Sequence, residues 1–199
     1  MLFRSDGNAK IEGIEAELRT EWETLSASIT DYASFVQNEE AVEAFYELVL
    51  DRHEEMCTIA CQTALAYGKA IMASDDEWGA KYDMSSKLEN DVYDDMLDNV
   101  EDLIYDDLFD DLEDYFYDGV LKDDDEAGVS FDEWYDTRSD EFDRWYDCRS
   151  DVYSDWYDTR YDVYDFKFDL AGELWSEDAD GAQKTIDRFE KKVNKRLGT

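Results

Sequence analysis

The chain has 199 residues, with 55 acidic against 19 basic side chains and a formal net charge of −36. Charge of this size usually indicates disorder, but 43% of the residues are hydrophobic and 15% aromatic, which is enough apolar material for a core. Proline, which interrupts helices, is absent. The composition therefore excludes global disorder and favours one all-α domain with long helices.

Neither a secretory signal nor a membrane span is predicted. The first residues lack the apolar region of a signal peptide. The least polar stretch, residues 56–73, contains Lys69 and few Leu or Ile residues, so we interpret it as the most buried helix of a bundle. The three cysteines, Cys57, Cys61 and Cys148, do not have the pattern of a disulfide framework. These features favour a reducing, cytoplasmic setting.

Apolar residues three and four positions apart predict a first helix from about Ala9 to Val36. Asn38 is the predicted N-cap of a second helix, with Glu39 and Glu40 at its positive end. The residues expected to face the core in these two helices are Ile11, Ile14, Leu18, Trp22, Leu25, Ile29, Tyr32, Val36, Val42, Phe45, Val49, Met56, Ile59 and Leu65.

The second helix also carries a strip of small residues, Ala60, Ala64 and Gly68, which would let another helix approach closely. After it, residues 74–77 (Ser-Asp-Asp-Glu) have the capping-box pattern, in which the serine and glutamate side chains satisfy free backbone donors. This pattern predicts the start of a third helix, which runs to about Leu121.

A charged loop, residues 122–129, separates the third helix from a fourth. Residues 130–133 (Ser-Phe-Asp-Glu) form a second capping box, and the fourth helix is predicted to continue to about Trp175. The Asp-Gly pair at 180–181 predicts a break, followed by a short final helix that ends near Leu197.

The predicted fold is an all-α, elongated bundle of about four long antiparallel helices plus a short C-terminal helix. Residues 1–74 form an N-terminal helical hairpin that supplies the core, and residues 75–178 form an acidic long helical hairpin. Residues 179–199 form the short basic helix. We expect all three segments to belong to one domain.

The fourth helix contains an eleven-residue repeat. The units are FDEWYDTRSDE from Phe131, FDRWYDCRSDV from Phe142 and YSDWYDTRYDV from Tyr153, followed by a degenerate unit from Tyr164. Eleven residues make three helical turns at ~3.67 residues per turn, close to the natural ~3.6. Equivalent positions therefore stay on one face of the helix.

Aromatic residues occupy positions one, four and five of the repeat, and an arginine occupies position eight. Arg138, Arg149 and Arg160 each follow a tryptophan by four residues and precede Phe142, Tyr153 or Tyr164 by four. Guanidinium groups stacked on rings in this way form favourable cation–π contacts. The alternative interpretation, which we favour, is that this face packs against the third helix and its arginines pair with acids there.

Aspartates recur at positions two, six and ten, on the side of the helix predicted to lie opposite the aromatic residues. Like charges four residues apart destabilise a helix, and aspartate is a poorer helix former than glutamate. Because the row has both of these costs, we expect the ordered row of charge itself to have a function. The candidate partner-binding residues on the third and fourth helices are Asp94, Asp95, Asp98, Asp102, Asp106, Asp110, Asp114, Asp132, Asp136, Asp140, Asp143, Asp147, Asp151, Asp158, Asp162, Asp165 and Asp169.

The density of these acids is close to that of a nucleic acid. Thirteen acids lie between Asp91 and Asp118, over ~42 Å of helix, and another thirteen between Phe131 and Asp169, over ~58 Å. Side by side, the two helices would carry about one negative charge per ~2 Å, compared with about one per ~1.7 Å in duplex DNA. Such a surface would release counterions to a groove lined by Lys and Arg, as DNA does.

In this character the chain resembles phage-type DNA-mimic inhibitors, the small acidic anti-restriction and anti-CRISPR decoys. The resemblance is one of acidic helical composition, strongest from Asp91 to Asp169. It implies a protein of an infected bacterial host's cytoplasm that occupies the nucleic-acid groove of a basic CRISPR effector or restriction complex. It also implies no direct contact with nucleic acid or membrane.

No recognisable catalytic or cofactor motif is present, so we expect neither an enzyme nor a cofactor. His53, Cys57 and Cys61 lie at i, i+4 and i+8, and adjacent members could share a zinc ion. The outer two are ~12 Å apart along the helix axis, so a complete site needs further ligands. We interpret the cysteines as small core residues and predict no metal site.

The final helix is rich in basic residues, with Lys184, Arg188, Lys191, Lys192, Lys195 and Arg196. Its basic side could dock on the acidic body of the protein or on a second copy in a homodimer. It could equally be a solvated helix whose cations suit its negative end.

Two other functions are compatible with the sequence. One is an acidic immunity or chaperone protein for a single dedicated basic partner, which DNA would not displace. The other is a structural helical protein from a salt-loving organism, acidic only for solvation. Unfolding at low salt would favour the second.

Overall fold

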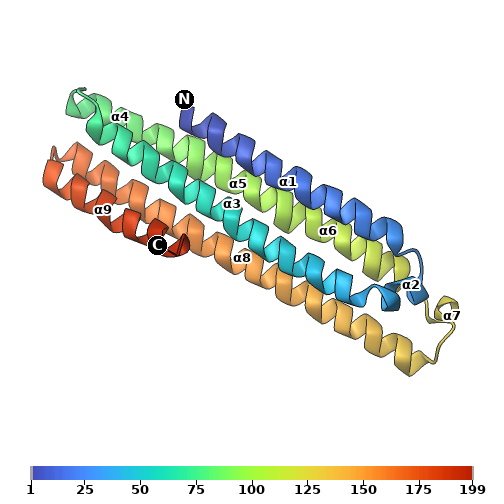
Figure 1. Cartoon of the computed structure of the whole chain (residues 1–199). Coiled ribbons are helices and arrows are strands. Elements are labelled where there is room, and N and C mark those ends of the chain that lie inside the picture. The colour runs from blue at the N-terminus through green and yellow to red at the C-terminus, as the bar shows by residue number, and fades with distance from the viewer. Residues whose placement is uncertain (1, 199) are drawn as a thin grey trace. The chain divides into compact units, whose positions relative to one another are not determined.

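The computed structural model describes residues 2–198, without the side chains of residues 2, 3 and 126. The protein is about 90% helical and contains no strand in the part described (Figure 1). The predicted all-α, bundle-like fold is confirmed. The helices are α1 (Leu2–Ser28), α2 (Tyr32–Gln37), α3 (Glu39–Ala73), α4 (Trp78–Leu88), α5 (Asp95–Val100), α6 (Phe109–Leu112), α7 (Asp124–Ala127), α8 (Phe131–Trp175) and α9 (Ala179–Arg196).

The chain forms two compact units. Unit 1 consists of Met1–Glu12, Glu55–Val100 and Asp155–Thr199, and unit 2 consists of Gly13–Glu54 and Glu101–Ser154. The helices α1, α3 and α8 therefore each contribute one part to each unit. Within both units, facing long segments run antiparallel, because contacts later in one segment meet residues earlier in the other. In unit 1, Glu89 pairs with Lys167 and Asp98 with Arg160. In unit 2, Tyr105 lies against Tyr153 and Tyr117 against Phe142.

The first predicted helix is wrong at both ends. α1 begins at Leu2 and ends at Ser28, and a separate short helix, α2, follows. Asp31 causes the break, because its carboxylate accepts a hydrogen bond from the amide of Ser34 at 2.8 Å while its own amide donates to the Ser34 hydroxyl at 3.0 Å. Val36, expected in the core, is 45% exposed.

The first predicted capping box is also wrong. The Ser74 hydroxyl donates to the carbonyl oxygen of Ile71, at the end of α3, so it does not cap the next helix. Glu77 precedes α4 and makes no side-chain capping bond. At the second box, the amide of Glu133 donates to the Ser130 hydroxyl at 3.3 Å, and the predicted range of the fourth helix is confirmed.

The last break lies earlier than predicted. Asp178 caps α9 by accepting a hydrogen bond from the amide of Gly181 at 2.9 Å, so residues 180–181 belong to the first turn of the helix. The chain turns at Glu177, which has a φ of 56°. The charged loop predicted at 122–129 contains the short helix α7, which ends in a C-cap at Gly128, whose φ of 72° suits a residue without a side chain.

The third predicted helix is continuous from Trp78 to Val120, but half of it is π-helical. Three π-helical segments, η1 (Glu89–Asp94), η2 (Glu101–Leu108) and η3 (Glu113–Val120), alternate with α5 and α6. They begin twelve residues apart, at equivalent glutamates of the sequence units ENDVYDDMLDNV, EDLIYDDLFDDL and EDYFYDGV. This twelve-residue repeat was not predicted.

The π-helical segments keep this twelve-residue repeat in step with the eleven-residue repeat of α8. In unit 1, the ring of Tyr93 lies 5.7 Å from that of Tyr164. In unit 2, Tyr105 lies 5.3 Å from Tyr153, and Tyr117 lies 5.5 Å from Phe142. A π turn closes one residue later than an α turn, so twelve residues advance as far along the helix as eleven do in α8.

The tryptophans of α8 follow the same register. The indole nitrogen of Trp156 donates to the carbonyl oxygen of Leu97 at 2.9 Å in unit 1. Trp145 donates to the carbonyl oxygen of Phe109 at 3.0 Å in unit 2. Each unit therefore contains one copy of the same hydrogen-bonded Trp contact.

The core of each unit contains residues predicted to be buried. In unit 1, a Cβ built on Gly68 would lie 2.5 Å from the ring of Phe166, so the small-residue strip does allow a close helix approach. In unit 2, Trp22 packs against Phe45 and Phe116, with ring centroids 5.8 Å and 5.4 Å apart. The cysteines Cys57, Cys61 and Cys148 are free and buried, as expected of core residues.

Candidate functional site

The two units carry very different charges. Unit 2 holds 32 acidic and six basic residues, a net charge of −26. Unit 1 holds 23 acidic and 13 basic residues, a net charge of −10. Most of the negative charge of the chain therefore belongs to unit 2, although the aspartate-rich helix α8 contributes to both units.

In unit 1, the basic helix α9 neutralises part of the aspartate row. Lys192 lies 2.5 Å from Asp162, Arg196 lies 2.9 Å from Asp155, and Arg188 pairs with Asp169. Figure 1 shows α9 (red) alongside the C-terminal part of α8 (orange). Docking of the basic helix on the acidic body is thus the interpretation that is confirmed.

The predicted site residues of unit 1 are mostly occupied by cations of the same unit. Asp95 pairs with Arg4 at 2.8 Å, and Asp98 pairs with Arg160. Four of the predicted residues are only half exposed: Asp98, Asp162, Asp165 and Asp169. Asp94 and Asp158 are exposed and, like Asp165, form no ion pair with the described residues.

The predicted site residues of unit 2 are instead all exposed: Asp102, Asp106, Asp110, Asp114, Asp132, Asp136, Asp140, Asp143, Asp147 and Asp151. Asp110 lies 3.6 Å from Arg149. The other nine pair with no cation among the residues that the structure describes. The structure therefore separates the seventeen predicted aspartates into a partly neutralised group in unit 1 and a group in unit 2 that is free except for Asp110.

The aromatic face of α8 divides into buried and exposed residues. The position-four tryptophans Trp145 and Trp156 are each 8% exposed and pack inward, as the favoured interpretation predicts. The position-one residues Phe142 and Tyr153 contact tyrosines of the facing repeat but remain 39% and 42% exposed, and the position-five residues face outward. In unit 2, Tyr135 and Tyr146 are 56% and 58% exposed, on the same outer side of α8 as the aspartates. The predicted opposition of aromatic and acidic residues therefore holds only for the tryptophans.

The arginines at position eight lie between two rings. In unit 2, the guanidinium of Arg149 lies 5.1 Å from the ring centroid of Trp145 and 4.4 Å from that of Tyr105. In unit 1, Arg160 lies 5.0 Å from Trp156 and 4.5 Å from Tyr93. The predicted stacking on tryptophan is confirmed. The second ring is a tyrosine of the facing twelve-residue repeat. The predicted pairing with acids is confirmed for Arg149 with Asp110 and for Arg160 with Asp98. It is wrong for Arg138, which donates to backbone carbonyl oxygens of the facing segment.

One carboxylate of α8 in unit 2 is buried. Glu141 is 2% exposed and accepts a hydrogen bond from the Tyr46 hydroxyl at 2.6 Å. Arg144 donates to it at 3.2 Å and also pairs with Glu39. Burial raises the pKa of Glu141 to about 7, and the hydrogen bonds from Tyr46 and Arg144 offset part of that effect.

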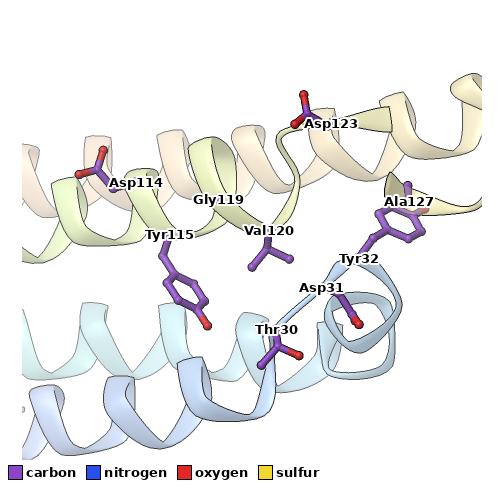
Figure 2. A pocket seen from close by; sticks show the side chains of 9 residues that line it. All are labelled: Thr30, Asp31, Tyr32, Asp114, Tyr115, Gly119, Val120, Asp123 and Ala127. Atoms are coloured by element: carbon purple, nitrogen blue, oxygen red, sulfur yellow. The ribbon is translucent and has the colours of Figure 1, made fainter. Parts of the chain in front are cut away.

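An acidic pocket of about 490 Å³ lies beside the end of η3 in unit 2 (Figure 2). Asp31, Asp114 and Asp123 line it, together with Tyr115 and other residues. The Tyr115 hydroxyl lies 2.6 Å from the carbonyl oxygens of Ser26 and Ile29, where α1 ends and leaves carbonyls without a helical partner. The pocket extends the acidic surface of unit 2 beyond α8.

The exposed aromatic residues and the twelve-residue repeat are features of the candidate site that the sequence analysis did not predict. The spacing of Tyr93, Tyr105 and Tyr117 was the signal for the repeat. Exposure of the tyrosines could not be read from the eleven-residue repeat, because positions one, four and five lie within one broad stripe.

Comparisons with protein families, with curated proteins and with solved structures found no match to the chain. Among the described residues, no helix is long and apolar enough to cross a membrane.

Proposed function

We propose that the protein is a nucleic-acid mimic, which inhibits a DNA-binding protein by occupying its basic groove with the aspartates of unit 2. The observation that supports this most is the row of free, exposed carboxylates on α8. Asp132, Asp136 and Asp140 lie four residues apart, and Asp143, Asp147 and Asp151 continue the row. A host defence protein, such as a CRISPR effector or a restriction complex, is the target that the resemblance implies.

The spacing of the row suits a surface that binds DNA phosphates. Four residues of α-helix advance by ~6 Å, so successive carboxylates present regularly spaced negative charges. A phosphate-binding groove gains affinity mainly by releasing the counterions of its ligand, and an ordered carboxylate row would release them in the same way. Aspartate has a short side chain, which keeps the charges close to the helix.

A dedicated basic partner is the second candidate function. The exposed aromatic residues among the aspartates favour it, because a general electrostatic decoy does not need them. The two functions differ in one respect: duplex DNA competes with the protein for the target of a mimic but not for a dedicated partner.

The test compares the wild-type chain with two charge variants on a solid support. The first replaces the six aspartates of the α8 row with asparagine: Asp132, Asp136, Asp140, Asp143, Asp147 and Asp151. The matched control replaces six exposed glutamates of the same unit with glutamine: Glu21, Glu23, Glu40, Glu43, Glu47 and Glu54. Both variants lose the same charge, so they separate the position of the carboxylates from the net charge.

Bacterial proteins retained at low salt are then eluted with duplex DNA. We expect a nucleic-acid-binding protein that the wild type and the control retain, that the α8 variant releases, and that DNA displaces. We expect the salt dependence to be steep, since each neutralised contact adds close to one unit to the slope of log K against log salt. Equal loss in both variants, or a partner that DNA does not displace, would contradict mimicry.

A further inference from the structure

Two aromatic pairs lie exposed on α8 in unit 2. Phe131 and Tyr135 have ring centroids 5.9 Å apart with planes at 22°, and Phe142 and Tyr146 have centroids 6.2 Å apart with planes at 23°. Their exposed fractions are 57% and 56% for the first pair and 39% and 58% for the second. Exposed aromatic groups of this kind mark interaction surfaces.

Each pair has a free carboxylate beside it. Asp132 precedes Tyr135 by three residues and Asp143 precedes Tyr146 by three, and residues three apart are neighbours on a helix surface. Both aspartates are exposed and form no ion pair with the described residues. The combination of ring faces and a carboxylate is therefore repeated, eleven residues or ~16 Å apart.

The same unit already binds arginine with this combination. Arg149 lies against the rings of Tyr105 and Trp145, and its guanidinium is 3.6 Å from Asp110. A planar guanidinium can stack on a ring and bond to a carboxylate at the same time, whereas an ammonium group acts as a point charge. The inner and outer faces of α8 thus offer similar groups, but in the described part of the chain only the inner face holds arginines against its rings.

We propose that each outer aromatic pair, with its aspartate, binds an arginine side chain of the partner, and that the surface selects arginine over lysine. This rests on the proposed function, because it names the basic groups that the acidic surface of unit 2 receives. The net charge of −26 on unit 2 favours a basic partner over a second copy of the chain or a nucleic acid. Two arginines about 16 Å apart on the partner would engage both pairs.

The test measures binding of two fluorescent peptides, nona-arginine and nona-lysine, to the full chain by anisotropy at fixed salt. The two peptides carry the same charge, so their difference reports the stacking. We expect nona-arginine to bind about tenfold more tightly, since exposed cation–π contacts are weak individually and two sites act together. The Tyr135→Leu/Tyr146→Leu variant should lose most of this preference while its affinity for nona-lysine stays unchanged.

Two matched variants complete the design. Tyr135→Phe/Tyr146→Phe keeps both rings and should keep the preference, whereas Asp132→Asn/Asp143→Asn should weaken both peptides. Circular dichroism shows whether each variant folds. Equal binding of the two peptides by the wild type, or an undiminished preference in the leucine variant, would overturn the arginine proposal and leave electrostatic mimicry standing. In the earlier test, failure of the wild-type chain to retain any target that DNA displaces would instead contradict the proposed function itself.

Discussion

Units 1 and 2 share the inner packing of α8 but differ on its outer side. In both units, a tryptophan of α8 donates to a backbone carbonyl and an arginine lies between two rings. Only unit 1 contains α9, whose cations pair with Asp155, Asp162 and Asp169. The comparison shows that a repeated helix can keep one packing scheme while a neighbouring segment decides where its charges remain free.

The difference also indicates which unit is better suited to the proposed binding of a basic partner. A carboxylate that already pairs with a cation of its own chain has less to offer a partner, since the existing pair must be broken first. The free row of unit 2 has no such cost. The proposed binding therefore belongs to unit 2, and we expect a mainly structural role for the aspartates that α9 covers.

The largest expected effect comes from the shared inner packing. Trp145→Ala and Trp156→Ala should each lower the free energy of unfolding by about 3–5 kcal/mol, because each removes a buried ring and leaves a carbonyl without its donor. Urea unfolding checks both. Similar losses would show that the two copies of the repeat are equivalent, whereas a large difference would break the comparison. The exposed control Tyr146→Ala should change stability by less than about 0.5 kcal/mol.

The next effect concerns Glu141, a buried carboxylate in unit 2. Its pKa is about 7 in the folded protein, against an ordinary value of 4.5. The folded state therefore holds a proton that the unfolded state has already released between pH 4.5 and 7, so this group's contribution to stability falls as pH rises through that window. The full change is up to about 3 kcal/mol.

Glu141→Gln should remove this dependence. We expect the free energy of unfolding of the variant to rise relative to wild type between pH 4.5 and 7.5, measured at constant ionic strength. The general repulsion among the other acids changes with pH in both proteins, so the difference between them isolates Glu141. A difference that stays flat across the window would contradict the raised pKa.

Some features of the fold and of the candidate site follow from the sequence, and others do not. The bounds of α8 follow from the eleven-residue repeat and the Ser130 cap, because both are local signals. The break before Tyr32 and the missing cap at Ser74 were not predicted. At both places a polar side chain can bond to the backbone in more than one way, and the sequence pattern does not decide between these bonds. The division of the aspartates into free and paired groups could not be predicted in full, since it depends on where α9 and Arg4 lie in the folded chain.

The π-helical segments were predictable only in part. A search for steps of three and four residues assumes α-helical geometry and cannot detect a turn that closes at five. The recurrence of Glu89, Glu101 and Glu113 was nevertheless visible as a period of twelve. The tyrosines four residues after each glutamate meet the eleven-residue repeat of α8, which links the two periods.

The smallest expected effect is the one that tests the difference between the units most directly. Replacing Arg188, Lys192 and Arg196 with glutamine removes the cations that α9 presents to α8 and should lower the free energy of unfolding by about 1–2 kcal/mol at low salt. Exposed ion pairs contribute little individually, but Arg196 is only 17% exposed and also donates to the Thr159 hydroxyl at 2.6 Å. Guanidinium chloride would screen these pairs, so the measurement uses urea.

The salt dependence of this stability loss distinguishes between its two possible causes. If the loss comes from unpaired aspartates of α8 repelling one another, added sodium chloride should reduce it, because the Debye length falls from about 10 Å at 0.1 M to about 3 Å at 1 M. The variant should also bind nona-lysine more tightly than wild type, since the freed aspartates make unit 1 resemble unit 2. A stability loss that salt does not reduce, with no gain in peptide binding, would mean that α9 stabilises unit 1 through apolar packing such as the Phe166–Phe189 stack at 4.2 Å, and that the charge difference between the units has another origin.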